Sequence, residues 1–397
     1  MFRRIFLFFG IVLSCLAAIV SIPFYSALIL RQGLEAPSNY APALFAAAPN
    51  VLRSVTSSNI QPDYASSSAS DRSEIAKLAN LTLRIEPTSP SALRALGQLS
   101  VADGNRFRAR QLILAGDALS HRDRQANLWL IDDSVQRGNL EQGLYYFDQL
   151  LRTLGDDRGS MIALFTQLLA DERAVEPMEK ILKRQPNWSE QFWLFIPGNT
   201  AVLENAAKLR VRLDDSMSAE DRKSDSILIA ALADAGHYSA GFAVAKTVFP
   251  SLSPSGVNNA NFSSSADVAP YNWQATGTNA FAVNVSERTN TLEISSSPGS
   301  SGDIIRQLVR LDPGGYRPVV TLSEDYQNQS LPELSVSLEC AGTDDRQSAL
   351  ILSYSERNAP QSPLTATADC TWFWVVLSSG YSMSAYDVSI ERIDLVR

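Results

Sequence analysis

The chain has 397 residues, of which 45% are hydrophobic and 19% are charged, and its formal net charge is −8 at pH 7. This length accommodates a membrane segment and two folded domains of ordinary size. Without Arg3, Arg4 and Arg31, 31 basic side chains remain against 42 acidic ones, a net charge of −11. This balance argues against nucleic acid and anionic lipid as partners, because both require clustered lysine and arginine.

Residues 5–30 contain no charged side chain. A helix rises about 1.5 Å per residue, so this segment can cross a hydrocarbon core of about 30 Å. A cleaved signal peptide is the alternative, but its apolar run is usually about 7–15 residues and a small-residue cleavage site follows it. The apolar run also continues past Cys15, which weakens a lipoprotein interpretation. We therefore predict that residues 1–31 are a single-pass anchor in a bacterial inner membrane, with the rest of the chain in the periplasm.

Residues 32–70 are rich in Ala, Pro and Ser and predict a linker or stalk, because such a composition cannot bury a core. Helical spacing begins near residue 71. Asp71 is expected to cap a helix over residues 72–84.

Three pairs of residues in the next part of the chain are 34 positions apart: Gly104 and Gly138, Ala109 and Gly143, Ile113 and Phe147. Each glycine of the first pair opens a Gly-Asn turn between two helical patterns. These offsets resemble the tetratricopeptide repeat, in which small residues lie where paired helices touch. The helices expected in this part are 92–103, 106–119, 125–137, 140–154, 160–169, 174–184, 199–213, 224–235 and 239–249.

The resemblance implies an α-solenoid over residues 71–250, whose concave surface would hold a protein partner. An irregular helical domain without a ligand is the alternative. Residues 251–260 are rich in Ser, Pro, Gly and Asn and predict a linker.

Short alternating strands follow over residues 261–397 and predict a β-sandwich, specifically a jelly roll. The expected strands are 280–285, 291–296, 303–311, 316–322, 333–339, 349–354, 372–377 and 385–395. The fold class is therefore helical first and all-β afterwards.

Two motifs in the β part are similar to those of carbohydrate-binding jelly rolls. One is Asn261-Phe262 followed by Pro270-Tyr271-Asn272-Trp273, and the other is the strand and Pro-Gly turn over residues 304–316. The resemblance implies the sandwich fold and leaves two roles open, glycan binding and structural packing.

Aromatic side chains are the expected means of glycan binding, because they stack on the apolar faces of sugar rings. The candidates are Tyr271, Trp273, Tyr326, Trp372, Trp374 and Tyr381. Of these, Tyr271, Trp273, Trp372 and Trp374 are the predicted ligand-binding set. Trp372 and Trp374 would share one face of their strand and Phe373, Val375 and Leu377 the other.

Cys340 and Cys370 would lie in an oxidising compartment if the anchor is correct, and they predict a disulfide. Two free buried thiols are the alternative. The chain has only two histidines, His121 and His237, so no histidine-based triad or metal site is expected, and no cofactor motif is present.

Together these features predict a non-enzymatic, membrane-anchored periplasmic scaffold. Its helical repeats would bind a protein partner, and its sandwich would bind glycan or serve in packing, a combination that suits surface polysaccharide assembly or export. One alternative is a carbohydrate-active hydrolase or lyase, which requires a pair of carboxylates in a cleft flanked by aromatics. Another is a purely structural module in which the sandwich caps the helical array.

Overall fold

The computed structural model describes residues 68–155, 158–213, 218, 222–264, 268–276, 280–324, 333–343, 345–352 and 363–397. The predicted anchor and nearly all of the predicted stalk lie outside these ranges. Among the described helices, none has the length and apolar character needed to span a bilayer. The chain divides into two compact units, residues 1–222 and residues 223–397.

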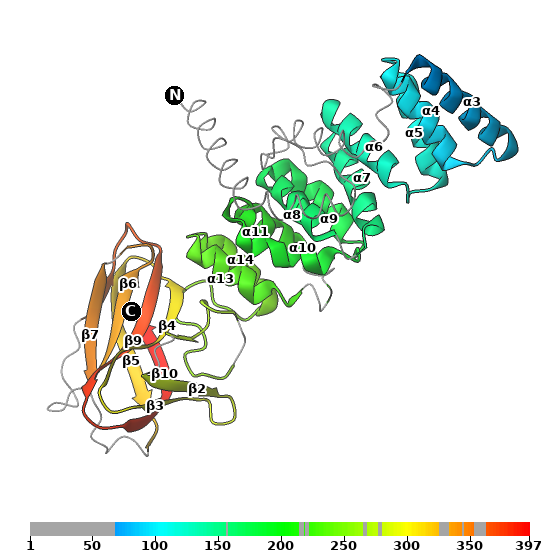
Figure 1. The fold of residues 1–397 in the computed structure, drawn as a ribbon. Coiled ribbons are helices and arrows are strands. Elements are labelled where there is room, and N and C mark those ends of the chain that lie inside the picture. The colour runs from blue at the N-terminus through cyan, green and yellow to red at the C-terminus, as the bar shows by residue number, and fades with distance from the viewer. Residues whose placement is uncertain are drawn as a thin grey trace. The chain divides into compact units, whose positions relative to one another are not determined.

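Helices in the first unit pack against one another in sequence order, α3 on α4, α4 on α5, α5 on α6 and α6 on α7 (Figure 1). Their bounds are Ala69–Ile85 for α3, Pro90–Ala102 for α4, Arg106–Leu119 for α5, Arg124–Gln136 for α6 and Leu140–Thr153 for α7. The later helices are α8 (Gly159–Gln167), α9 (Val175–Leu182), α10 (Ser189–Phe195) and α11 (Leu203–Arg212). Short 3-10 turns connect these later helices.

Two turns at the 34-residue offset have the same geometry. Gly104 and Gly138 have φ values of 77° and 70°, a conformation that glycine adopts without steric cost. The asparagine after each glycine caps the next helix, Asn105 by accepting from the amide of Arg108 and Asn139 by accepting from the amide of Gln142. The equal spacing in the sequence therefore reflects one helix–turn–helix shape formed twice.

The start of α3 differs from the prediction. Ser68, not Asp71, is the N-cap residue, and its hydroxyl accepts from the Asp71 amide at 3.1 Å. The Asp71 carboxylate accepts from the Ser68 amide in return at 3.3 Å. Asp71 thus occupies the third helical position of a capping box, so the expectation that it is the cap was wrong.

The second unit begins with a helical hairpin, α13 (Asp225–Asp234) and α14 (Tyr238–Val248), and continues with two antiparallel five-stranded sheets. One sheet has the order β1-β4-β9-β6-β7 and the other β2-β3-β10-β5-β8. The first sheet comprises β1 (Gln274–Ala275), β4 (Ser300–Arg310), β9 (Trp372–Ser382), β6 (Leu334–Cys340) and β7 (Arg346–Leu352). The second comprises β2 (Phe281–Ser286), β3 (Thr291–Ser296), β10 (Tyr386–Val396), β5 (Gly314–Leu322) and β8 (Leu364–Ala366).

A single apolar core lies between the two sheets. It includes Val336, Phe373 and Val375 from the first sheet and Leu292 and Ile390 from the second. The predicted order of helices followed by a sandwich of antiparallel sheets is therefore confirmed, and every predicted strand overlaps an observed one. Among the described α-helices and strands, three were not predicted: α10 and the two shortest strands, β1 and β8.

The segment predicted as a linker, residues 251–260, is bonded to strand β4. The side chain of Gln307 accepts from the amide of Asn258 at 2.8 Å and donates to its carbonyl at 2.9 Å. The amide of Gly256 also donates to the carbonyl of Arg310 at 2.9 Å. These bonds satisfy buried backbone groups and fix the entry of the chain into the sandwich.

The predicted disulfide is confirmed. Cys340 is the last residue of β6 and is bonded to Cys370, which lies two residues before β9, with their Cα atoms 6.0 Å apart. The bridge joins neighbouring strands of the first sheet, because β6 pairs with β9.

Candidate functional site

Strand β9 determines where two of the predicted aromatic residues, Trp372 and Trp374, point. Phe373, Val375 and Leu377 enter the core between the sheets. Side chains alternate along a strand, so Trp372 and Trp374 lie on the outer face of the first sheet. The predicted alternation of this strand is confirmed.

Trp372 is covered by helix α14. Its ring lies 6.3 Å from that of Tyr238, 5.8 Å from that of Phe242 and 5.7 Å from that of Tyr271, measured between centroids. Its indole Nε1 donates to the Ser239 hydroxyl at 3.3 Å. With 9% of its surface exposed, Trp372 mainly holds the helix on the sheet.

Tyr271 belongs to the same contact and is fully buried. Its hydroxyl donates to the carbonyl of Tyr238 at 2.5 Å, and burial raises its pKa well above the usual range. Gly241 allows this approach, because a Cβ at that position would lie 2.5 Å from the Tyr271 hydroxyl.

Trp273 lies inside the sandwich, with its ring 6.0 Å from that of Phe262. Its indole Nε1 has no hydrogen-bond partner among the described residues. Tyr326 lies outside the described residues, and Tyr381 is exposed at the end of β9. Three of the four predicted ligand-binding aromatics, Tyr271, Trp273 and Trp372, are thus buried in packing contacts.

Trp374 keeps a partly exposed ring on the outer face of the first sheet. The guanidinium carbon of Arg306 lies 4.3 Å from the ring centroid, a cation–π arrangement. Glu339 is directly opposite Trp374 on the neighbouring strand β6. This face therefore presents an aromatic ring between a cationic and an anionic side chain.

A second polar group lies on the same face. The guanidinium of Arg346 donates to both carboxylate oxygens of Asp303, at 2.7 and 3.1 Å, and to the hydroxyls of Ser337 and Ser378, at 2.9 and 2.8 Å. Arg346 and Trp374 lie on β7 and β9, whose backbones are about 10 Å apart with β6 between them. We call Arg306, Trp374, Glu339, Arg346 and Asp303 the outer-face site.

The electrostatics of the outer-face site bear on catalysis. The hydrogen bond from Arg346 is the largest influence on the Asp303 carboxyl and holds its pKa below the usual range, although partial burial opposes the shift. Asp303 is consequently ionised at neutral pH and unsuited to donate a proton to a leaving group.

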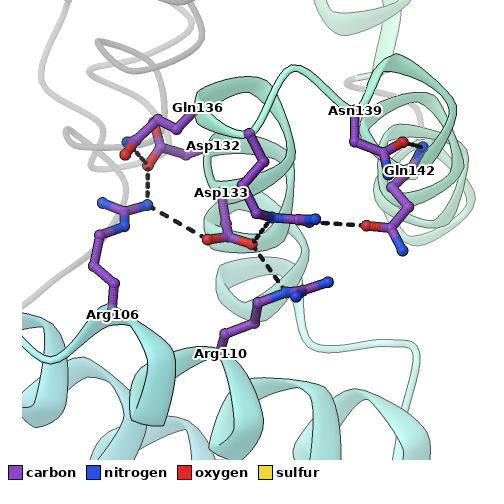
Figure 2. Close-up of polar contacts among 8 residues, drawn as sticks. Arg106, Arg110, Asp132, Asp133, Gln136, Asn139 and Gln142 are labelled. Atoms are coloured by element: carbon purple, nitrogen blue, oxygen red, sulfur yellow. Dashed lines mark hydrogen bonds and ion pairs between the residues drawn. The ribbon is translucent and has the colours of Figure 1, made fainter.

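The first unit contains a polar network that the sequence patterns did not predict. Asp132 and Asp133 on α6 are almost fully buried and face Arg106 and Arg110 on α5 (Figure 2). Asp133 lies 3.2 Å from Arg110 Nε and 2.9 Å from Arg137 Nε, and Asp132 accepts from Arg106 at 3.1 Å.

The same network extends along α6 and into α7. Gln136 donates to Asp132 at 2.6 Å, and Arg137 donates to Gln142 of α7 at 2.8 Å (Figure 2). Arg106 also lies over the ring of Trp129, 5.4 Å from its centroid. The network joins three consecutive helices and fixes their register. The signal available in the sequence was the pair of adjacent acids inside an otherwise apolar helix.

No metal-holding cluster of three or more His, Cys, Asp or Glu side chains is present among the described residues. Comparisons with protein-family models, curated proteins and solved structures found no match for this chain. Function therefore has to be argued from the surfaces of the two units themselves.

Proposed function

We propose that the chain is a non-enzymatic, membrane-anchored scaffold of the bacterial periplasm that binds a protein through its helical unit and glycan through its sandwich. The observation that carries the proposal is an uncovered apolar stripe on the first described helix. Leu78, Leu81 and Ile85 are each more than half exposed and are spaced three and four residues apart, which places them on one face of α3.

An exposed apolar stripe on a helix of a helical array favours a protein partner. In stacked repeats each helix pair covers the apolar face of the next, and terminal units ordinarily present a polar outer face. The three exposed aliphatic side chains on one face of α3 depart from this polar pattern. They offer an area that a partner helix could bury.

The test is crosslinking mass spectrometry on the full chain in its native membranes, comparing the wild type with a Leu81→Ser, Ile85→Ser double variant. We expect the variant to lose its crosslinked partner. Met383→Ser is the matched control, because Met383 is even more exposed than Leu81 and Ile85 but belongs to the second unit. Retention of the partner by the double variant, or equal loss in the control, would refute the docking of a protein on α3.

Tetratricopeptide-like repeats are part of this proposal. They are supported by the duplicated Gly-Asn turns and by the contact of Gly97 in α4 with α5, where an added Cβ would lie 2.6 Å from Ile113 Cγ1 and 3.2 Å from the Ala109 carbonyl. Small residues at such a contact are what lets paired helices approach closely in this repeat.

A jelly roll is the proposed topology of the sandwich. From β3 onward, every connection except that between β6 and β7 crosses from one sheet to the other. The resulting four-stranded groups, β3-β10-β5-β8 and β4-β9-β6-β7, support an eight-stranded jelly roll to which β1 and β2 are added at the edges.

Glycan binding is proposed for the outer-face site. The Trp374 ring offers a stacking surface, and Arg306, Glu339 and Arg346 offer donors and acceptors for hydroxyl groups. On a glycan array, the full chain should bind a surface polysaccharide, and Trp374→Ala should reduce binding at least tenfold while Met383→Ala leaves it unchanged. Undiminished binding by Trp374→Ala would exclude this face as the glycan site.

Membrane anchoring is proposed from residues 5–30. Replacing Val12 and Ile19 with Asp should release the chain from membranes during fractionation, because a charged side chain at the bilayer centre costs about 3 kcal/mol. Continued resistance of this variant to alkaline extraction would contradict the anchor. An alkaline phosphatase fusion after residue 397 should be active if the chain is periplasmic.

A further inference from the structure

The first unit contains a pocket that plays no part in the functions proposed above. It lies where the turn between α5 and α6 meets the last turn of α7, and its volume is about 560 Å³. This size is typical of sites for small molecules. The residues that line it are His121, Arg122, Arg124, Gln149, Arg152 and Thr153.

Three arginines make the pocket cationic. Arg152 is paired with Asp148 at 2.8 Å, and Arg124 donates to the carbonyl of Thr153 at 2.6 Å. A guanidinium has five N–H donors, so these bonds leave donors on both side chains that can still meet a ligand. Arg122 adds a third, exposed guanidinium. Arginines in this number favour an oxyanion, which they can bind in bidentate fashion.

Among the described residues, two acids near the pocket, Asp148 and Asp117, are already engaged. Asp148 is buried and accepts from Arg152 and from the indole of Trp188, the latter at 2.9 Å. Asp117 lies 3.2 Å from His121 Nδ1 and is buried beneath it. Burial raises the pKa of Asp117, and the hydrogen bond with His121 opposes this shift. Among the described side chains that line the pocket, the arginines therefore set the sign of the charge.

Gln149 supplies a second and independent observation. Only 7% of its surface is exposed, and its Nε2 lies 3.3 Å from His121 Nδ1. Its Oε1 is buried and has no hydrogen-bond partner among the described residues. An unsatisfied buried carbonyl is costly, so this atom calls for a donor from a ligand.

We propose that this pocket binds a small hydroxylated oxyanion, of the class of sugar acids and sugar phosphates. The oxyanion would be held by Arg122, Arg124 and Arg152, and a ligand hydroxyl would donate to Gln149 Oε1. The ligand requires both the negative charge and the hydroxyl group. A neutral sugar lacks the charge, and inorganic phosphate at neutral pH lacks the carbon-bound hydroxyls that reach the amide.

The test is isothermal titration calorimetry on the purified full chain with four probes: glucuronate, glucose 6-phosphate, inorganic phosphate and glucose. Glucuronate or glucose 6-phosphate should bind at least tenfold more tightly than inorganic phosphate, and glucose should not bind. The tighter of the two charged sugars identifies the oxyanion as a carboxylate or a phosphate. Equal affinity for inorganic phosphate and the charged sugars, or binding of none of the four probes, would overturn the proposal.

Point variants distinguish binding in this pocket from non-specific attraction to positive charge. Arg122→Ala with Arg124→Ala should weaken the charged sugars at least tenfold, and both side chains are exposed enough for the fold to survive. Arg184→Ala, which removes an exposed arginine outside the pocket, is the matched control and should change nothing. Gln149→Leu should weaken the charged sugars and leave inorganic phosphate within twofold. Equal losses in the Arg184 control, or none in the double variant, would refute the site.

Discussion

Removing the disulfide should destabilise the second unit by about 3.6 kcal/mol. The bridge between Cys340 and Cys370 spans a sequence separation of 30 residues. Closing a loop of that length removes about 12 cal/mol/K of entropy from the unfolded chain, which is about 3.6 kcal/mol at 25 °C. We would replace both cysteines with alanine, because Cys370 belongs to the core and a serine hydroxyl there would add a cost of its own.

Hydrogen exchange followed by mass spectrometry is the appropriate assay, because it reports the two units separately in one sample. Amides of β4 and β9 that exchange only by global unfolding should exchange about 400-fold faster in the double alanine variant, since about 1.36 kcal/mol corresponds to a factor of ten. Amides of α5 to α7 are the internal control. Acceleration below tenfold in the strands, or equal acceleration in α5 to α7, would refute the loop-entropy reasoning.

Three further changes test the packing and the electrostatics. Gly97→Ala should cost about 1–3 kcal/mol in thermal melts, because the new Cβ would lie 2.6 Å from Ile113 Cγ1, and combining it with Ile113→Ala, which removes Cγ1, should cost less than the sum of the two single changes. Gly241→Ala should destabilise the second unit, because the new Cβ would lie 2.5 Å from the Tyr271 hydroxyl, and adding Tyr271→Phe should relieve this contact. A double variant no more stable than Gly241→Ala alone in urea titrations would contradict this. Asp303 has a folded pKa below the ordinary value of 3.8, so its stabilising contribution is complete above that value and is lost as the pH falls through the lower folded pKa. Asp303→Asn should therefore lower the urea midpoint at pH 6, and its difference from the wild type should shrink as the pH falls through the folded pKa of Asp303. A constant difference between them would contradict the assignment.

Local patterns in the sequence were sufficient for most of the fold. The helix α5 and the strand β3 have the predicted bounds, because each combines an uninterrupted period with clear turn residues at both ends. The strand β8 and the helix α10 were missed for a physical reason: with three and seven residues, they are too short to show a clear period.

The candidate site was predictable only in part. Strand alternation correctly separated Phe373 from Trp372 and Trp374, but it carries no information on what lies above the outer face. Helix α14 covers Trp372 and leaves Trp374 partly open, and that difference depends on a contact more than 130 positions away in the sequence. The ion pairs of Asp133 and the unpaired amide oxygen of Gln149 likewise depend on which helices are neighbours. The periodicity of the sequence does not reveal which helices pack together.

The position of α14 connects the fold of the second unit to its proposed function. Composition changes at residue 250, yet the compact unit begins at residue 223 and includes α13 and α14. The aromatic cluster of Trp372, Tyr271 and Phe242 explains why, since the helix and the sheet bury each other's rings. A fragment that starts at residue 251 would expose Trp372 and Tyr271 on the very face where glycan binding is proposed. Binding by such a fragment would then reflect rings that are buried in the intact unit, so only a protein that retains α14 can test whether Trp374 is a glycan ligand.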